Sequence, residues 1–146
     1  MLDYPIKLNK IFDKLNKHTT KIILVGGYVR DYFLGLDSKD IDIEVYGIES
    51  FEILENILHK FSKVSSVGKS FGVCKLNYEG YDLDFSLPRH DNKINSGHTG
   101  FKVVINPYMD FKTACYRRDF TINTIGFDVI KKEILDPFNG IKDIEN

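Results

Sequence analysis

The sequence has few cysteines and no long apolar segment, and each absence excludes a class of protein. Its two cysteines, Cys74 and Cys115, are far apart and form no zinc-ligand spacing with any histidine. They suit a reducing cytoplasm, as buried or idle thiols. No apolar run reaches the roughly 18–20 residues of a membrane-spanning helix. The first residues, MLDYPIKLNK, lack the apolar centre of a signal peptide. We therefore expect a cytoplasmic protein without membrane contact.

The chain also lacks an excess of charge, an internal repeat and a low-complexity tract. Its net charge is −1, so RNA binding would need a local basic patch or a further segment. The segment Gly68–Gly72, GKSFG, lacks the spacing of a P-loop and is interpreted as a turn. With 146 residues, 42% hydrophobic and 28% charged, the chain has the composition of one soluble globular domain.

What the chain does contain is an ordered stretch from Lys21 to Gly47 that organises the rest. An apolar run, Ile22–Val25, ends in Gly26-Gly27, and about two helical turns follow. Ile41–Tyr46 then alternates apolar and polar residues, as a half-buried strand does. The stretch predicts a strand, a tight glycine turn, a short helix and a second strand.

Two chemical signals lie in this stretch. Gly26-Gly27 lets the backbone approach a ligand closely, and the amides of a following helix point toward anions such as phosphate. Asp40 and Asp42 are two residues apart, so on a strand both carboxylates project from one face and can bridge two hard cations. Alone, the glycines predict only a turn and the aspartates only a solvated face. Their order and spacing together indicate a nucleotidyl transferase.

A second acidic strand follows downstream. Val73–Tyr78 and Tyr81–Leu87 are strand-like runs joined by Glu79-Gly80, which predicts a tight hairpin. Asp82 and Asp84 share one face of the second run. If this strand lies beside Ile41–Tyr46, either carboxylate can join the first pair.

Apolar spacing and capping residues predict the remaining elements. The predicted elements are an amphipathic helix over Pro5–His18, a helix from the Ser50 cap to Phe61, a short strand at Lys63–Val67, a strand-like run at Phe101–Ile105, helices over Asp110–Arg118 and Phe120–Phe127, and a hairpin at Asp128–Leu135. Arg89–Lys102 is polar and carries glycines, which predicts a mobile, locally basic loop.

Five sequence blocks follow one another along the chain: GGYVRDYFLG with KDIDIEVYG, DFSLPR, GHTGF, RRDFTIN and DPFNG. In this order they resemble one known family, the bacterial tRNA nucleotidyltransferases and poly(A) polymerases, or class II CCA-adding family. The resemblance covers Ile22 to Gly140. It implies an α+β fold similar to the nucleotidyltransferase head of DNA polymerase β, with a mixed, mostly antiparallel sheet flanked by helices.

The resemblance implies a reaction and a catalytic set. The expected reaction adds CMP or AMP from CTP or ATP to the 3′ end of tRNA or another RNA and releases pyrophosphate. Asp40, Asp42 and Asp84 would be catalytic and would hold two Mg²⁺, with Asp82 as the second choice for the third acid. The implied nucleotide-binding residues are Gly26, Gly27, Arg30, Arg117, Arg118, Asp119 and Asn123. Arg89, His98 and Lys102 are expected in a loop that contacts RNA or triphosphate.

The domain organisation follows from the same resemblance. Residues 1–140 are expected to form the catalytic head, and residues 141–146 the start of a truncated or absent helical neck. The base-reading motif and the RNA-binding body of longer members have no counterpart in this sequence. The chain could therefore be an excised domain, a split-enzyme subunit that needs a partner chain, or a minimal protein. A head that only binds nucleotide or RNA is the alternative to a self-sufficient enzyme. A related transferase acting on a protein or small molecule is disfavoured by RRDFTIN and DPFNG.

Overall fold

The structure is a computed structural model. It describes residues 3–19, 21–65, 72–93, 101–105, 108–112 and 124–145. The helices are η1 (Ile6–Leu8), α1 (Asn9–Leu15), α2 (Gly27–Phe33), α3 (Phe51–Leu58) and α5 (Gly140–Glu145). The strands are β1 (Lys21–Val25), β2 (Asp40–Tyr46), β3 (Val73–Tyr78), β4 (Tyr81–Ser86), β5 (Arg89–Lys93), β6 (Phe101–Ile105), β7 (Gly126–Asp128) and β8 (Glu133–Leu135).

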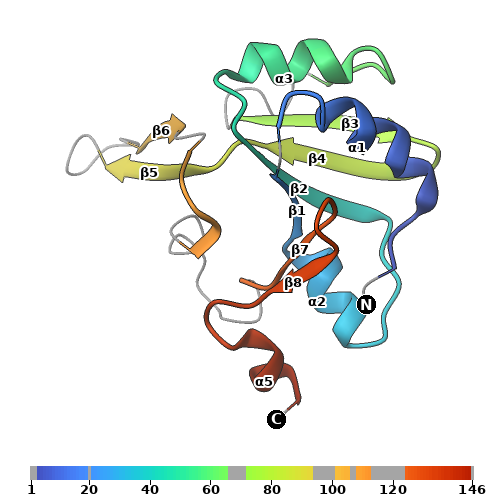
Figure 1. The fold of residues 1–146 in the computed structure, drawn as a ribbon, viewed down its shortest axis with the longest axis vertical. Helices are drawn as coiled ribbons and strands as arrows, with labels where there is room; N and C mark the ends of the chain where they lie inside the picture. Colours follow the sequence, from blue (N-terminus) through green and yellow to red (C-terminus); the bar gives the residue numbers. More distant parts are fainter. Residues whose placement is uncertain are drawn as a thin grey trace.

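A six-stranded sheet in the order β3-β4-β2-β1-β7-β8 forms the centre of the fold (Figure 1). Within it β2 and β4 are parallel, and the other four neighbouring pairs are antiparallel. The chain reaches β4 from β2 through α3 and β3, because parallel neighbours need a long connection. The expected mixed and mostly antiparallel sheet is confirmed.

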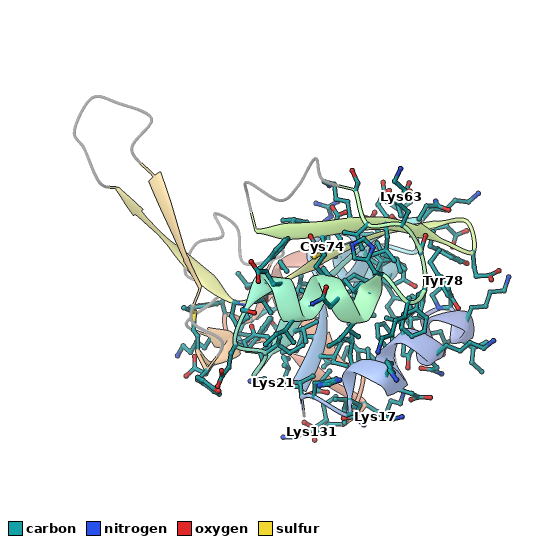
Figure 2. The ribbon with its side chains drawn as sticks, turned by 90° about the horizontal axis from the view of Figure 1, so that it is seen from above. Lys17, Lys21, Lys63, Cys74, Tyr78 and Lys131 are labelled. Carbon is teal, nitrogen blue, oxygen red and sulfur yellow. The ribbon has the colours of Figure 1, made fainter. Side chains whose placement is uncertain are left out.

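One face of this sheet carries the main hydrophobic core. Helices α1 and α3 lie on that face (Figure 2) and contribute fully buried side chains such as Leu15 and Leu58. The sheet contributes alternate residues, among them Leu24, Ile43 and Phe85, which are also fully buried. Cys74 is buried in this core, as expected, while Cys115 lies outside the described residues.

The opposite face divides into an apolar part and a polar part. Over β1, Ile23 and Val25 pack with Met109 and Phe111 in a second hydrophobic cluster. Over β2 and β4 the same face bears carboxylates instead. Because side chains alternate between faces, the strands that complete the core also present these acids.

The hairpin between β3 and β4 fixes how those two strands align. Glu79 and Gly80 have φ of 55° and 87°, the left-handed pair that a two-residue hairpin turn requires. Tyr78 therefore pairs with Tyr81, and Lys75 pairs with Asp84. The predicted hairpin is confirmed.

The C-terminal elements follow the expected pattern. The predicted hairpin at Asp128–Leu135 is confirmed as the β7–β8 pair. Asp136 accepts hydrogen bonds from the amides of Gly140 and Ile141 at 2.5 and 3.0 Å, so its carboxylate caps the start of α5. That α5 begins a neck stays a prediction.

Several local predictions were wrong. Arg89–Lys102 is not wholly a loop, because Arg89–Lys93 and Phe101–Ile105 pair as an antiparallel ladder that projects from the sheet in Figure 1. Pro88 ends β4 but leaves the next residues extended, and the β-branched run at residues 103–105 supplies a partner strand. The helix predicted to reach Phe127 was wrong at its end, where Gly126–Asp128 is β7.

Other predicted boundaries moved by a few residues. The helix predicted to start at Pro5 is a 3₁₀ turn followed by α1, and α3 ends at Leu58 rather than Phe61. At the predicted Lys63–Val67 strand, the described part holds a single bridge between Ser65 and Lys75. Within the described ranges, no helix has the length and apolar character needed to cross a membrane.

Gly126 should not tolerate a side chain. A Cβ there would lie 2.6 Å from Cγ2 of Ile23 and 2.7 Å from Cζ of Phe111. We expect Gly126→Ala to lower the free energy of unfolding by about 1–3 kcal/mol in urea unfolding. Phe111→Leu in the same chain should recover part of that loss, since it removes the ring. If the changes in unfolding free energy of the two single variants simply add in the double variant, the contact between residues 126 and 111 is contradicted.

Candidate active site on the parallel strand pair

The parallel pairing of β2 and β4 brings the predicted acids together. Asp40 pairs with Asp82, and Asp42 pairs with Asp84. Partners on neighbouring strands are about 4.8 Å apart and point to the same face. Asp40, Asp42 and Asp82 are exposed and Asp84 is half-buried, so this acidic face is open to solvent.

The predicted glycine turn lies directly beside Asp42. Gly26 has φ +69° and ψ −144°, a conformation that L side chains rarely adopt. A Cβ on Gly26 would lie 2.9 Å from Oδ2 of Asp42. The absence of a side chain at residue 26 therefore lets the β1–α2 turn approach the Asp42 carboxylate.

Arg30 extends the same turn with a positive charge. Its Nη2 lies 3.2 Å from where a Cβ on Gly27 would be, so the guanidinium folds back over the glycine turn. Its Nε donates to Oδ1 of Asp31 at 3.2 Å. The Arg30–Asp31 pair braces α2 and places a cation within reach of an anion at the turn.

Lys75 on edge strand β3 binds the predicted third acid. Its Nζ donates to Oδ2 of Asp84 at 2.8 Å, and the two side chains are 45% and 33% exposed. The hydrogen bond to Asp84, with the charges of Asp84, Asp42 and Asp40, raises the pKa of Lys75 above its ordinary value. Lys75 is therefore a cation throughout the physiological pH range.

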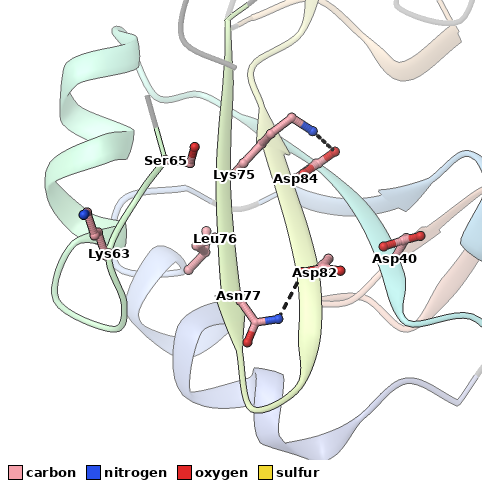
Figure 3. A pocket seen from close by; sticks show the side chains of 8 residues that line it. All are labelled: Asp40, Lys63, Ser65, Lys75, Leu76, Asn77, Asp82 and Asp84. Carbon is pink, nitrogen blue, oxygen red and sulfur yellow. Dashed lines mark hydrogen bonds and ion pairs between the residues drawn. The ribbon is translucent and has the colours of Figure 1, made fainter. Parts of the chain in front are cut away.

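The neighbouring pair is bound in a similar way by an uncharged residue. Asn77 Nδ2 donates to Oδ1 of Asp82 at 3.0 Å. The two bonds cross from β3 to β4 in Figure 3, around a hollow of about 570 Å³. This hollow is lined by Asp40, Lys63, Ser65, Lys75, Leu76, Asn77, Asp82 and Asp84.

Further along β2 the carboxylate row becomes buried. Glu44 has no exposed surface and accepts a hydrogen bond from the hydroxyl of Tyr46 at 3.1 Å. It follows Asp42 on the same face but lies toward the second hydrophobic cluster. The solvent-open acids are thus confined to the first half of β2 and its β4 partners.

The donor chemistry of the open acids fits Mg²⁺, which prefers carboxylate oxygens and keeps several waters. As the side chains stand, however, the described residues contain no group of three or more His, Cys, Asp or Glu that could hold a metal ion. Lys75, at 2.8 Å from Asp84, occupies one of the oxygens such a group would use.

Other predicted site residues lie elsewhere or cannot be described. Arg117, Arg118, Asp119, Asn123 and His98 lie outside the described residues. Arg89 and Lys102 are not loop residues, because their backbones lie in strands β5 and β6. Lys75 and Asn77 were not predicted as site residues, although alternation along VCKLNY and the Glu79-Gly80 turn together place both on the acidic face.

Comparison with known proteins identifies the family of this chain. The family described as "Poly A polymerase head domain" matches residues 22–146. The chain belongs to this family. The CCA-adding enzyme of Buchnera aphidicola subsp. Baizongia pistaciae is 40% identical over 126 residues, which are 86% of this chain and 28% of that protein.

Two solved structures share the fold. A Bacillus stearothermophilus CCA-adding enzyme in complex with CTP has a TM-score of 0.67 and 25% identity, over 97% of this chain and 32% of that one. A tRNA nucleotidyltransferase complexed with a primer tRNA and an incoming ATP analog has a TM-score of 0.64 and 27% identity, over 86% and 33%. The fold is the expected nucleotidyltransferase fold. The chain spans about a third of the length of these relatives.

Gly26 offers a test of the turn beside Asp42. We expect Gly26→Ala to lower the free energy of unfolding more than Gly35→Ala does in urea unfolding. Gly35 has a similar φ of +74° but no neighbour within 4 Å of an added Cβ, so it reports the cost of a positive φ without crowding, about 1–2 kcal/mol. Equal losses in the two variants would mean that the Asp42 carboxylate does not crowd Gly26.

Proposed function

We propose that this chain is the catalytic head of an RNA nucleotidyltransferase that adds CMP or AMP from CTP or ATP to a tRNA 3′ end. The observation that carries the proposal is the in-register pairing of Asp42 with Asp84 beside the Gly26 turn. Membership of the family and the likeness to nucleotide-bound and tRNA-bound structures support it.

In this proposal Asp40, Asp42 and Asp84 are the catalytic, metal-holding carboxylates. Bound by them, two Mg²⁺ would lower the pKa of the attacking RNA 3′-hydroxyl and neutralise charge on the leaving pyrophosphate. In this in-line reaction the 3′-oxygen would bond to the α-phosphorus opposite the bond to pyrophosphate, which breaks, and the hydroxyl proton would pass to one of the carboxylates or to solvent.

The triphosphate would lie toward the glycine turn. Gly26 and Gly27 leave room for close approach, and Arg30 places a guanidinium over that turn. We further propose that Arg117, Arg118, Asp119 and Asn123 hold the triphosphate and ribose. Arg89, His98 and Lys102 are proposed to contact RNA or triphosphate.

Asp84 is preferred to Asp82 as the third acid because of its register. Asp84 pairs with Asp42, the carboxylate beside the glycine turn, whereas Asp82 pairs with Asp40 near the start of β2. Asp82 is therefore assigned to the rim of the acidic face.

The length of this chain, compared with that of its relatives, favours a second candidate function. Because the chain spans about a third of the enzymes it matches, a head that binds triphosphate but depends on neck and body segments is the alternative. Those segments would come from the same polypeptide or a partner chain. In either case we place the protein in the cytoplasm, the reducing compartment that a chain with only two widely separated cysteines suits.

Labelled CTP or ATP incorporation into tRNA lacking its 3′ end tests the proposal, with Mg²⁺ present. Asp42→Asn and Asp84→Asn should each lower incorporation by at least about 10³-fold, since each removes a charge that the transition state needs. Asp82→Asn, the matched control, should stay within about tenfold of wild type. The Asp42→Asn and Asp84→Asn proteins should both remain folded, as measured by circular dichroism, because removing one of several like charges relieves repulsion.

The outcomes separate the two candidates. Incorporation that depends on Asp42 and Asp84 means a self-sufficient head. No incorporation by wild type, with triphosphate bound far more tightly than monophosphate, means a head that needs further segments. Equal binding of triphosphate and monophosphate contradicts both.

A further inference from the structure

The four acids on β2 and β4 create an electrostatic problem for the folded head. Asp40, Asp42, Asp82 and Asp84 occupy two successive registers of neighbouring strands, about 4.8 Å apart across the pair. Like charges directly opposite each other on a sheet destabilise it. A divalent cation would relieve this repulsion, but the strand pairing must also form without one.

The structure supplies an internal cation at this place. Lys75 belongs to the same register as Asp42 and Asp84, on the far side of β4, and its ammonium contacts Asp84 at 2.8 Å. With Lys75 there, one carboxylate of the group is neutralised. Asn77 contacts Asp82 in the adjacent register but brings no charge.

The ammonium and a divalent cation would compete for the same oxygen. Lys75 donates to Oδ2 of Asp84, and the described residues as arranged hold no three-residue metal group. Giving up this bond frees Oδ2 of Asp84 for a cation shared with Asp40 and Asp42. Lys75 is 45% exposed on an edge strand, and the hollow lined by Ser65 and Asn77 leaves its side chain room to move.

We propose that Lys75 is a built-in counter-cation of the active site, a positioning residue that holds Asp84 until a divalent cation displaces it. The inference rests on the proposed function for the role of Asp84. It adds that metal loading is an exchange of one cation for another. The Asp84 carboxylate is then never left without a cation. The lysine therefore weakens divalent-cation affinity while it stabilises the metal-free head.

The test measures cation binding rather than nucleotide transfer. Mn²⁺ is titrated calorimetrically into chelator-treated wild type, Lys75→Met, Lys75→Gln and Lys75→Arg. Met and Gln keep much of the side-chain length without the charge, and Arg keeps the charge. Lys63→Met is the matched control, because Lys63 lies in the segment that follows α3 and lines the same hollow.

We expect Lys75→Met and Lys75→Gln to bind Mn²⁺ about 3- to 10-fold more tightly than wild type, since a nearby positive charge is removed. Their melting temperatures should be lower than wild type in chelator and should rise more on Mn²⁺ addition. Lys75→Arg and Lys63→Met should match wild type within about twofold.

The proposal is overturned if Lys75→Met and Lys75→Gln both bind Mn²⁺ no more tightly than wild type. It is also overturned if neither wild type nor any variant binds Mn²⁺. A control Lys63→Met that binds as tightly as Lys75→Met also overturns it, because the effect would then be one of general charge. Tighter binding in the neutral variants, with no nucleotide incorporation by wild type, supports the exchange and counts against stand-alone catalysis alone.

Discussion

The in-register parallel pairing of β2 with β4 is the constraint on which the rest of the structure depends. A shift of one residue would turn every side chain of one strand to the opposite face. Asp82 and Asp84 would then enter the core, and Leu83 and Phe85 would leave it. Hydrophobic burial therefore fixes the face on which these acids lie, and the register observed between the strands brings Asp42 opposite Asp84.

The two faces of the sheet carry different tasks. The face under α1 and α3 supplies most of the apolar burial, and hence most of the stability. The other face has apolar cover over β1 and is open over β2 and β4. An open acidic face is unfavourable for stability, and the contacts of Lys75 and Asn77 reduce that cost. The acidic face therefore has a different neighbour on each side. The Gly26 turn lies beside Asp42, and Lys75 of β3 contacts Asp84.

Prediction from the sequence was most accurate where one strong local signal acted. The Glu79-Gly80 turn, the alternation in β4 and the Asp128–Leu135 hairpin were all predicted, because each depends on neighbouring residues. It failed where a distant partner decides. Arg89–Lys93 has no apolar alternation, and its extended form becomes stable only by pairing with Phe101–Ile105. The sequence spacing placed Gly126 and Phe127 at the end of a helix. In the structure they belong to strand β7, which pairs with β1.

The sequence by itself determined the family, the class of fold and the pair Asp40 and Asp42, because two residues of spacing on a strand place both on one face. It narrowed the third acid to Asp82 or Asp84 by the same alternation. Only the tertiary structure decided which acid is opposite which, because register between strands far apart in sequence is set by packing. The contact of Lys75 with Asp84 was also decided by the tertiary structure. The sequence of a strand shows which side chains share a face, but not which strand will lie beside it.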